Sequence, residues 1–493
     1  MSDCQIVALG VRGMGFGSER SDLPVVASSF SDKVGTFFAS DRLPAALVVI
    51  GLALFAFDDI SALRQLGGGF LASPSWAPIL LATAMVLHKT VQKSDRPLLI
   101  SLGAVWLYGL VLTLATLPII QNEIDSDSSL SKSLKLAVTF AVLLSMVLAG
   151  VVLVRRLRKW VLVGATIALA IMVITAVIAQ LGYNGIDDWG VIHSAQNFQM
   201  RVRGTRFEAS SLGGGFLVLG GLIALLVGGR RGILTVIAAA ALALVITQSR
   251  GTMIVALCVI VIGAIWWFVG RRVSNARRWF GYLIAGVAVA AALFLSLGVD
   301  MVLSSQWWID IGLANSAGST SDATRAAWAT VSAQTLTQYP AGMGYAAYLE
   351  WLPRMLREIV SGMTTQFPPE ALLELKATIL SDDDTTLSAK TLPAVAITYF
   401  GWIGLLSAGA LYFFAVVKST GSRGVFNLAA LPVAAMLVLV SSTYLWSVFS
   451  WDQMFLFGAL LLGAAPRSDR DDAVAETQSE GGLDFSDTVS PSR

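Results

Sequence analysis

The chain has few charged residues and very little cysteine. Only 13% of its 493 residues are Asp, Glu, Lys or Arg, whereas soluble domains carry about 25%, so an ordinary soluble domain is excluded. The two cysteines, Cys4 and Cys258, imply no disulfide or metal framework, and we expect neither a metal nor another cofactor. The basic residues occur in short clusters between apolar runs rather than on one surface, so we expect no nucleic-acid partner.

What the sequence has in abundance is apolar residues. They make up 55% of the chain, and the mean hydropathy is +0.72. A membrane-spanning helix needs about 17 to 25 mostly apolar residues. We therefore predict an all-α, polytopic membrane helix bundle embedded in a lipid bilayer, with twelve transmembrane helices at residues 43–59, 70–88, 97–120, 134–154, 160–181, 211–228, 232–248, 251–269, 279–299, 393–417, 426–443 and 446–465.

The distribution of Lys and Arg predicts the orientation of these helices. Basic clusters fall on alternate connections, which the positive-inside rule assigns to the cytoplasm. Both termini are then cytoplasmic. The predicted parts are a cytoplasmic segment 1–42, helices one to nine in 43–299, a periplasmic loop 300–392, helices ten to twelve in 393–465 and a disordered cytoplasmic tail 466–493.

The predicted periplasmic loop is unusually long, and loops of this length are more often functional than idle. It contains Trp307, Trp308, Trp328 and Trp351, together with helix-like runs at 322–336 and 349–360. These give it apolar surface to bury, so we predict a partly helical loop. Its tryptophans could stack on sugar rings or lie at the membrane interface in the ordinary way.

Arg250 is the first functional candidate, because it stands between two apolar segments, 233–247 and 252–268, with almost no other charge nearby. An arginine at the bilayer centre costs about 2.5 to 3.5 kcal/mol on insertion scales. The alternative is an arginine at a tight turn whose long side chain reaches the interface. The predicted topology puts Arg250 on the periplasmic side, against the positive-inside trend, which favours the functional interpretation.

Three further arginines, Arg201, Arg203 and Arg206, precede the predicted sixth helix on the same side. Arginines beside the free amides of a helix N-terminus can bind phosphate or diphosphate. Contact with lipid headgroups is the alternative.

In the loop, Asp322, Arg325 and Trp328 have helical spacing, and a Pro-Ala-Gly-Met-Gly turn follows at residues 340–344. Arg325 can form an ordinary surface pair with Asp322. The turn allows a close backbone approach, or is a loop that simply needs glycine.

Taken in order, these segments resemble the O-antigen ligase and O-antigen or exopolysaccharide polymerase superfamily of bacterial inner-membrane proteins. Four pieces between Arg201 and Leu406 carry the resemblance. They are Arg203-Gly204 with residues 207–210 before a helix, Ser249-Arg250-Gly251 opening a helix, Arg325 and Trp328 followed by residues 340–344, and the Tyr-Phe-Gly-Trp-Ile-Gly run at 399–404.

The resemblance implies a metal-independent glycosyltransferase of the inner membrane with a periplasmic active site. It would take glycan from a polyprenyl diphosphate-linked oligosaccharide and pass it to a sugar hydroxyl of the growing glycan acceptor. A chain-length regulator or export proteins are the further partners we expect. The catalytic candidates are Arg250, Arg203 and Arg325, with Glu208 as general base unless it only forms an ion pair with a neighbouring arginine.

The substrate-binding candidates are Arg201, Arg206, Trp328, Lys390 and His193. Lys390 stands about where ligases of the family have a histidine, so we favour a polymerase over a ligase. Ala209 replaces a proline often found after the glutamate. His193 is a second base candidate, and the alternative for it is a merely exposed side chain. A flippase or transporter of an anionic lipid-linked substrate would also use arginines, although no internal repeat is visible.

Overall fold

The structure is a computed structural model. It describes residues 41–57, 60, 63, 73–121, 126–181, 209–247, 250–269, 283, 286–287, 320–364, 369, 372–373, 375–376, 391–421, 428–442 and 450–462. Two compact units are present, Met1–Leu43 and Pro44–Arg493. Every element described in the second unit is a helix, as predicted.

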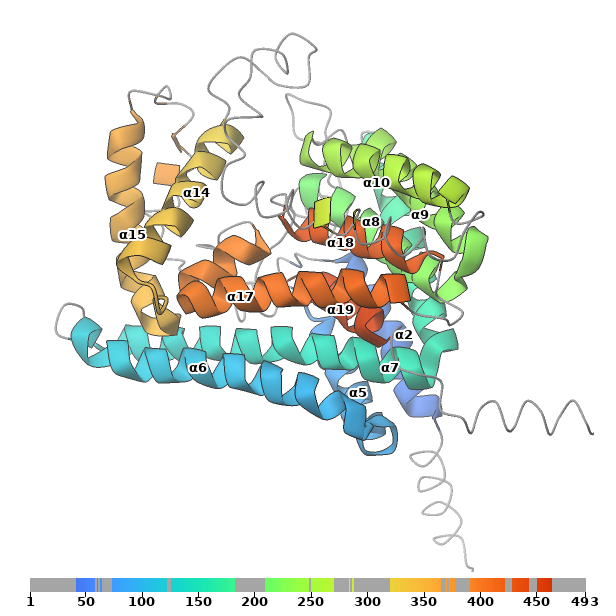
Figure 1. The fold of residues 1–493 in the computed structure, drawn as a ribbon, viewed down its shortest axis with the longest axis horizontal. Helices are drawn as coiled ribbons and strands as arrows, with labels where there is room; N and C mark the ends of the chain where they lie inside the picture. Colours follow the sequence, from blue (N-terminus) through green and yellow to red (C-terminus); the bar gives the residue numbers. More distant parts are fainter. Residues whose placement is uncertain are drawn as a thin grey trace, which may run out of the picture. The chain divides into compact units, whose positions relative to one another are not determined.

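The described helices overlap the predicted apolar runs (Figure 1), but the predicted count of twelve membrane helices is not confirmed. The predicted helix at 279–299 lies outside the described residues, apart from single positions. In chain order the elements are α2 (Arg42–Ala53), η1 (Leu54–Ala56), α5 (Trp76–Thr90), η2 (Lys93–Asp95), α6 (Arg96–Gln121), α7 (Ser126–Gln180), α8 (Ala209–Val227), α9 (Gly229–Thr247), α10 (Arg250–Val269), α14 (Thr320–Gln338), α15 (Gly344–Met363), α17 (Leu392–Gly421), α18 (Ala430–Ser442) and α19 (Trp451–Leu462).

Within the described residues five helices are long and apolar enough to cross a membrane, as expected of a membrane protein. The helix α7 covers two predicted spans, because it continues through a break at Leu157, where φ is −122° and ψ is 32°. Three shorter apolar helices occur at Arg42–Ala56, Ser211–Val227 and Ala430–Ser442. The five long candidates are Arg96–Pro118, Ser133–Gln180, Gly229–Thr247, Gly251–Phe268 and Leu392–Val417.

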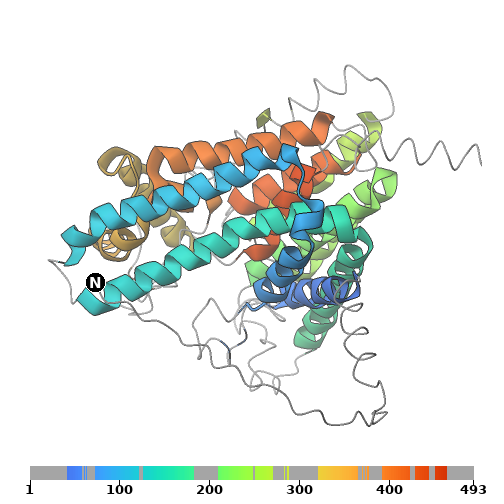
Figure 2. The same cartoon turned by 90° about the horizontal axis from the view of Figure 1, so that it is seen from below.

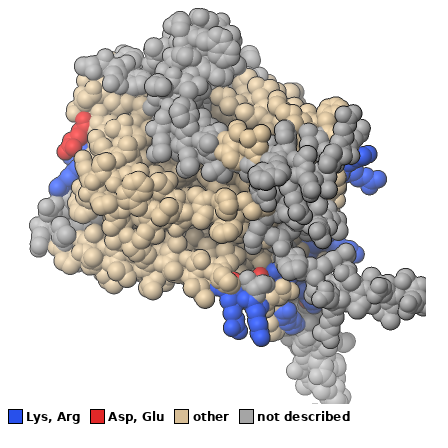
Figure 3. Space-filling view, viewed as in Figure 1, with Lys and Arg blue, Asp and Glu red and all other residues tan. Residues whose placement is uncertain are grey.

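The outer surface of these helices suits a lipid environment. On α6, Ile100 and Leu114 are 70% and 72% exposed, which would be unfavourable in water for so large an apolar face. Figure 3 shows charged residues confined to a few places, with large uncharged areas between them. On this face the described surface therefore has the pattern of a protein in a lipid bilayer.

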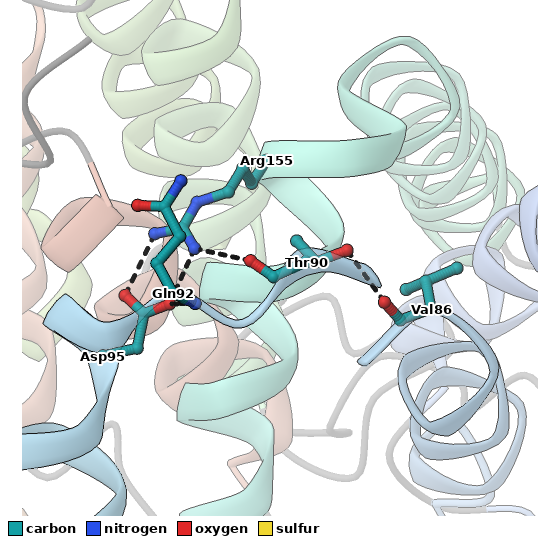
Figure 4. A network of polar contacts seen from close by, with 5 residues as sticks. All are labelled: Val86, Thr90, Gln92, Asp95 and Arg155. Atoms are coloured by element: carbon teal, nitrogen blue, oxygen red, sulfur yellow. Dashed lines mark hydrogen bonds and ion pairs between the residues drawn. The ribbon is translucent and has the colours of Figure 1, made fainter. Parts of the chain in front are cut away.

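An ion pair fixes the end of α6 that carries the basic clusters (Figure 4). The guanidinium of Arg155 on α7 donates to both carboxylate oxygens of Asp95, at 2.7 and 3.1 Å, and to the carbonyl of Thr90 at 2.9 Å. Asp95 also accepts the backbone N–H of Gln92 at 2.8 Å. Because the pair is nearly buried and bidentate, it joins the end of α5, the start of α6 and α7 in one geometry.

The long loop is partly helical, as predicted, since α14 and α15 cover the two helix-like runs. Figures 1 and 2 show both helices close to one end of α6 and α17. Leu352, Met355 and Leu356 of α15 are buried, whereas Arg354 and Arg357 are exposed. The apolar face of α15 therefore packs on the helical body.

Candidate functional site

The starts of α8 and α10 lie side by side. The helix α9 packs against both and reverses the chain direction between them, so α8 and α10 begin at the same end. Near that end a Cβ atom on Gly213 would lie 2.3 Å from the Thr252 Oγ1 and 2.4 Å from its Cγ2. Only glycine permits this approach, which brings together two helix N-termini with their unpaired amide groups.

Two of the predicted segments lead directly into these helix starts. The helix α8 begins at Ala209, the residue after Glu208, and α10 begins at Arg250 itself. The backbone position of Arg250 is therefore described, while the direction of its side chain lies outside the described part. Both helix dipoles put partial positive charge at this end, where an anion would be stabilised.

The helix α14 carries Arg325 and Trp328 and packs against α17 and α15. Trp328 is only 3% exposed and belongs to the apolar core. Its carbonyl accepts the hydroxyl of Ser332 at 2.9 Å. The side chain of Arg325 lies outside the described part, so what the structure gives is its place on the helix.

The 340–344 turn joins α14 to α15 and meets α17 at a break in that helix. Gly401, inside α17, has φ 57° and ψ −135°, a conformation accessible essentially only to glycine. A Cβ atom on Gly342 would lie 2.5 Å from the Tyr399 carbonyl oxygen and 2.6 Å from the Gly401 nitrogen. The turn and the broken helix therefore touch through their backbones.

The turn also takes over a hydrogen bond of α17. In an uninterrupted helix the Trp402 N–H would donate to the Thr398 carbonyl. Here Trp402 N–H donates to the Pro340 carbonyl at 3.0 Å, and the Thr398 carbonyl accepts Met343 N–H at 3.0 Å. One bond within the helix is thus replaced by two bonds to the turn, which satisfies the groups that the break releases.

A second helix, α6, holds the other side of the turn. The Tyr108 hydroxyl donates to the Ala341 carbonyl at 2.9 Å, and Thr113 Oγ1 accepts the Tyr345 N–H at 2.9 Å. Gly109 leaves room for the ring of Tyr345, because a Cβ there would lie 2.6 Å from the Tyr345 hydroxyl. The turn is therefore held between α6 and α17.

Aromatic rings fill the space beside this junction. The ring centroid of Phe140 on α7 lies 5.4 Å from that of Tyr345, 4.7 Å from that of Tyr399 and 5.6 Å from that of Phe400. The hydroxyl of Tyr345 is buried and has no hydrogen-bond partner among the described residues.

Most of the predicted site residues lie outside the described residues. In the described part, Arg250 and Arg325 have defined backbone positions and Trp328 also has a defined side chain. No cluster of His, Cys, Asp or Glu that could hold a metal ion occurs within that part. The residues outside the description are Arg201, Arg203, Arg206, Glu208, His193 and Lys390.

Sequence reasoning missed the contribution of α6 to the junction. Tyr108, Gly109 and Thr113 stand in an apolar run that was interpreted only as a membrane span. Gly109 and Thr113 are four residues apart and so lie on one helix face, and a small residue followed by Thr at this spacing is a pattern from which a helix contact can be inferred.

The fold and this junction together define an α-helical membrane protein. In it, the turn between α14 and α15 forms backbone hydrogen bonds with the apolar helix α17 at its break. No family model, no curated protein and no solved structure matches the chain.

Proposed function

We propose that the chain is a polymerase of lipid-linked surface polysaccharide repeat units in a bacterial inner membrane. The observation that carries this proposal is the contact of Gly213 with Thr252, which puts the starts of α8 and α10 together. In the sequence, Arg201, Arg203, Arg206 and Glu208 lead into α8, and Arg250 opens α10. A segment with three arginines and a segment that holds the single Arg250 thus lead into neighbouring helix starts.

The proposed chemistry is transfer of glycan from polyprenyl diphosphate to a sugar hydroxyl. The bond between the anomeric carbon and the diphosphate oxygen breaks, and the acceptor oxygen forms the new bond to that carbon. The acceptor proton passes to a carboxylate, for which Glu208 is the candidate, and the polyprenyl diphosphate leaves. Arginines and two helix N-termini stabilise the negative charge that develops on the leaving group.

The proposed topology follows from the basic clusters. Twelve membrane helices with both termini in the cytoplasm would put the starts of α8 and α10 at the periplasmic face. The helices α14 and α15 follow on the same side, where they would carry Arg325 towards the acceptor. The resemblance to the polymerase and ligase superfamily supports this arrangement through the order of the four motifs.

The experiment is deletion of the gene followed by gel analysis of glycan chain length, with complementation by Arg250→Ala and Arg203→Ala. We expect deletion to abolish long polymer and both variants to fail in restoring it at equal protein level. Arg231→Ala is the matched control, because Arg231 is an exposed arginine at the opposite end of this helix group.

Three results would overturn parts of the proposal. Normal chain length without the protein rejects the polymerase. Loss of attachment to an acceptor lipid, with polymer still made, replaces it by a ligase. Accumulation of repeat units on the cytoplasmic leaflet after deletion indicates a flippase instead.

A further inference from the structure

The 340–344 turn lies well inside the depth of two candidate membrane spans. On α6 its contacts fall at Tyr108, Leu112 and Thr113, about 8 to 15 Å from the Pro118 end of the span at 1.5 Å per residue. On α17 its contacts run from Thr398 to Trp402, about 9 to 15 Å from the Leu392 end by the same measure. The contacts on α6 and the contacts on α17 therefore place the turn at the same distance from the ends of the two spans.

The exposed side of the turn has a polar group that lipid cannot satisfy. Pro340 and Ala341 are both exposed. Their carbonyls are paired with Trp402 N–H and the Tyr108 hydroxyl, but among the described residues nothing accepts the N–H of Ala341. In hydrocarbon an unpaired backbone amide is strongly unfavourable, and non-helical backbone at this depth occurs where it is buried in protein or faces a water-filled cavity. Because Ala341 is exposed, the described part of the chain does not bury it.

We infer that the turn is a re-entrant element whose exposed side lines a water-filled cavity that opens at the end of the bundle marked by Pro118 and Leu392. The chain enters this turn from α14, exposes Ala341 to water at membrane depth between α6 and α17, and leaves along α15.

The walls of this cavity suit a carbohydrate, an assignment that rests on the proposed function. The rings of Tyr339 and Trp351 are stacked, with centroids 4.6 Å apart and planes at 20°, and both side chains are half-buried beside the exposed turn. A rigid aromatic pair offers a flat apolar face to the C–H side of a sugar ring. Water or the N–H of Ala341 can form hydrogen bonds with the hydroxyls of that sugar. Under the proposed function, the carbohydrate in this cavity is the growing glycan.

The test is cysteine accessibility in the full-length protein in membranes, in a background where Cys4 and Cys258 are replaced by serine. Ala341→Cys is treated with a membrane-impermeant methanethiosulfonate reagent, which needs a thiolate and therefore reacts only in water. Val111→Cys is the matched control, since Val111 lies at the same depth on α6 and is 55% exposed. We expect modification of Ala341→Cys at least about tenfold faster than of Val111→Cys, because a thiolate does not form in hydrocarbon.

Two results would contradict the proposal of a water-filled cavity. If Ala341→Cys reacts as slowly as Val111→Cys, the turn faces lipid. If both react rapidly, neither position lies at membrane depth. Pro340→Cys serves as a second reporter if Ala341→Cys does not accumulate as folded protein.

The labelling experiment does not depend on glycan transfer, so the cavity and the proposed function can fail separately. The carbohydrate assignment is tested by chain length in Trp351→Leu and Trp351→Phe. We expect loss of long chains in Trp351→Leu and their retention in Trp351→Phe, which keeps an aromatic face. Equal polymer in Trp351→Leu and wild type would reject the carbohydrate while leaving the cavity in place.

Discussion

Gly342 and Gly401 contact each other through their backbones, although 58 residues lie between them in the sequence. Both have positive φ, 91° and 57°. A Cβ on Gly401 would lie 2.5 Å from the Gly342 nitrogen and 2.1 Å from the Pro340 carbonyl oxygen. The two glycines therefore meet two requirements at once, an unusual backbone conformation and the absence of a side chain.

Replacing either glycine by alanine should destabilise the junction. A strained φ/ψ costs about 1 to 3 kcal/mol, and the added Cβ must also displace backbone. We expect Gly401→Ala and Gly342→Ala to lower the thermal unfolding temperature of the protein purified in detergent. Gly409→Ala is the control on the same helix, because nothing lies within 4 Å of its position. Equal unfolding temperatures for Gly401→Ala and Gly409→Ala would contradict the close contact.

The sequence alone predicted the helices much better than it predicted their contacts. Apolar length located α6, α8, α10 and α17, and the order of the motifs singled out both the 340–344 turn and residues 399–404. Nothing in the pattern indicated that these two motifs bind each other, because the pairing uses backbone groups and carries no side-chain signature. The break at Gly401 could not be predicted either, because glycine is common in membrane helices.

Thr113→Val should weaken the attachment of the turn to α6. Valine has nearly the same shape as threonine, but it leaves the buried Tyr345 N–H without an acceptor, and a buried unpaired donor costs about 1 to 3 kcal/mol. We expect a lower unfolding temperature than for wild type. Thr113→Ser, which keeps the oxygen, should recover most of the loss. Thr166→Val is a control, because that exposed hydroxyl bonds only within its own helix.

Tyr345→Phe should not lower the stability of the protein, in contrast to Thr113→Val. The Tyr345 hydroxyl is buried and has no hydrogen-bond partner among the described residues, so its removal relieves the desolvation of a polar group, about 1 kcal/mol or more. We expect an unchanged or higher unfolding temperature and normal glycan chain length. A loss of polymer in a stably folded Tyr345→Phe protein would show instead that the hydroxyl takes part in function.

Breaking the pair of Arg155 with Asp95 should be costly. The two side chains are 17% and 10% exposed, and removal of one partner leaves a nearly buried charge, a loss of about 3 kcal/mol. We expect Asp95→Asn and Arg155→Ala each to reduce the yield of folded protein and the unfolding temperature. Lys159→Ala, an exposed cation on the same helix, should be close to wild type. If the double variant loses as much as the two single variants together, the two residues do not interact.

Gly213→Ala tests the contact on which the proposed function rests. The new methyl group would lie 2.3 Å from the Thr252 Oγ1 and 2.9 Å from its Cβ, so α8 and α10 must move apart at the end where Arg250 opens α10. We expect glycan chain length to fall at equal protein level, as in Arg250→Ala. Gly103→Ala is the control, because nothing lies within 4 Å of that position on α6.

A second substitution distinguishes this spacing effect from general damage to the fold. Thr252→Ala removes the two atoms closest to the new methyl group, so Gly213→Ala with Thr252→Ala should recover polymer length towards wild type. Thr252→Ala alone should be tolerated, since its buried hydroxyl has no hydrogen-bond partner in the described part of the chain. If the double variant stays as defective as Gly213→Ala, or if Gly213→Ala makes normal polymer, the separation of α8 from α10 is not what controls transfer. Recovery in the double variant would show that the glycine acts by setting the distance between two helix N-termini.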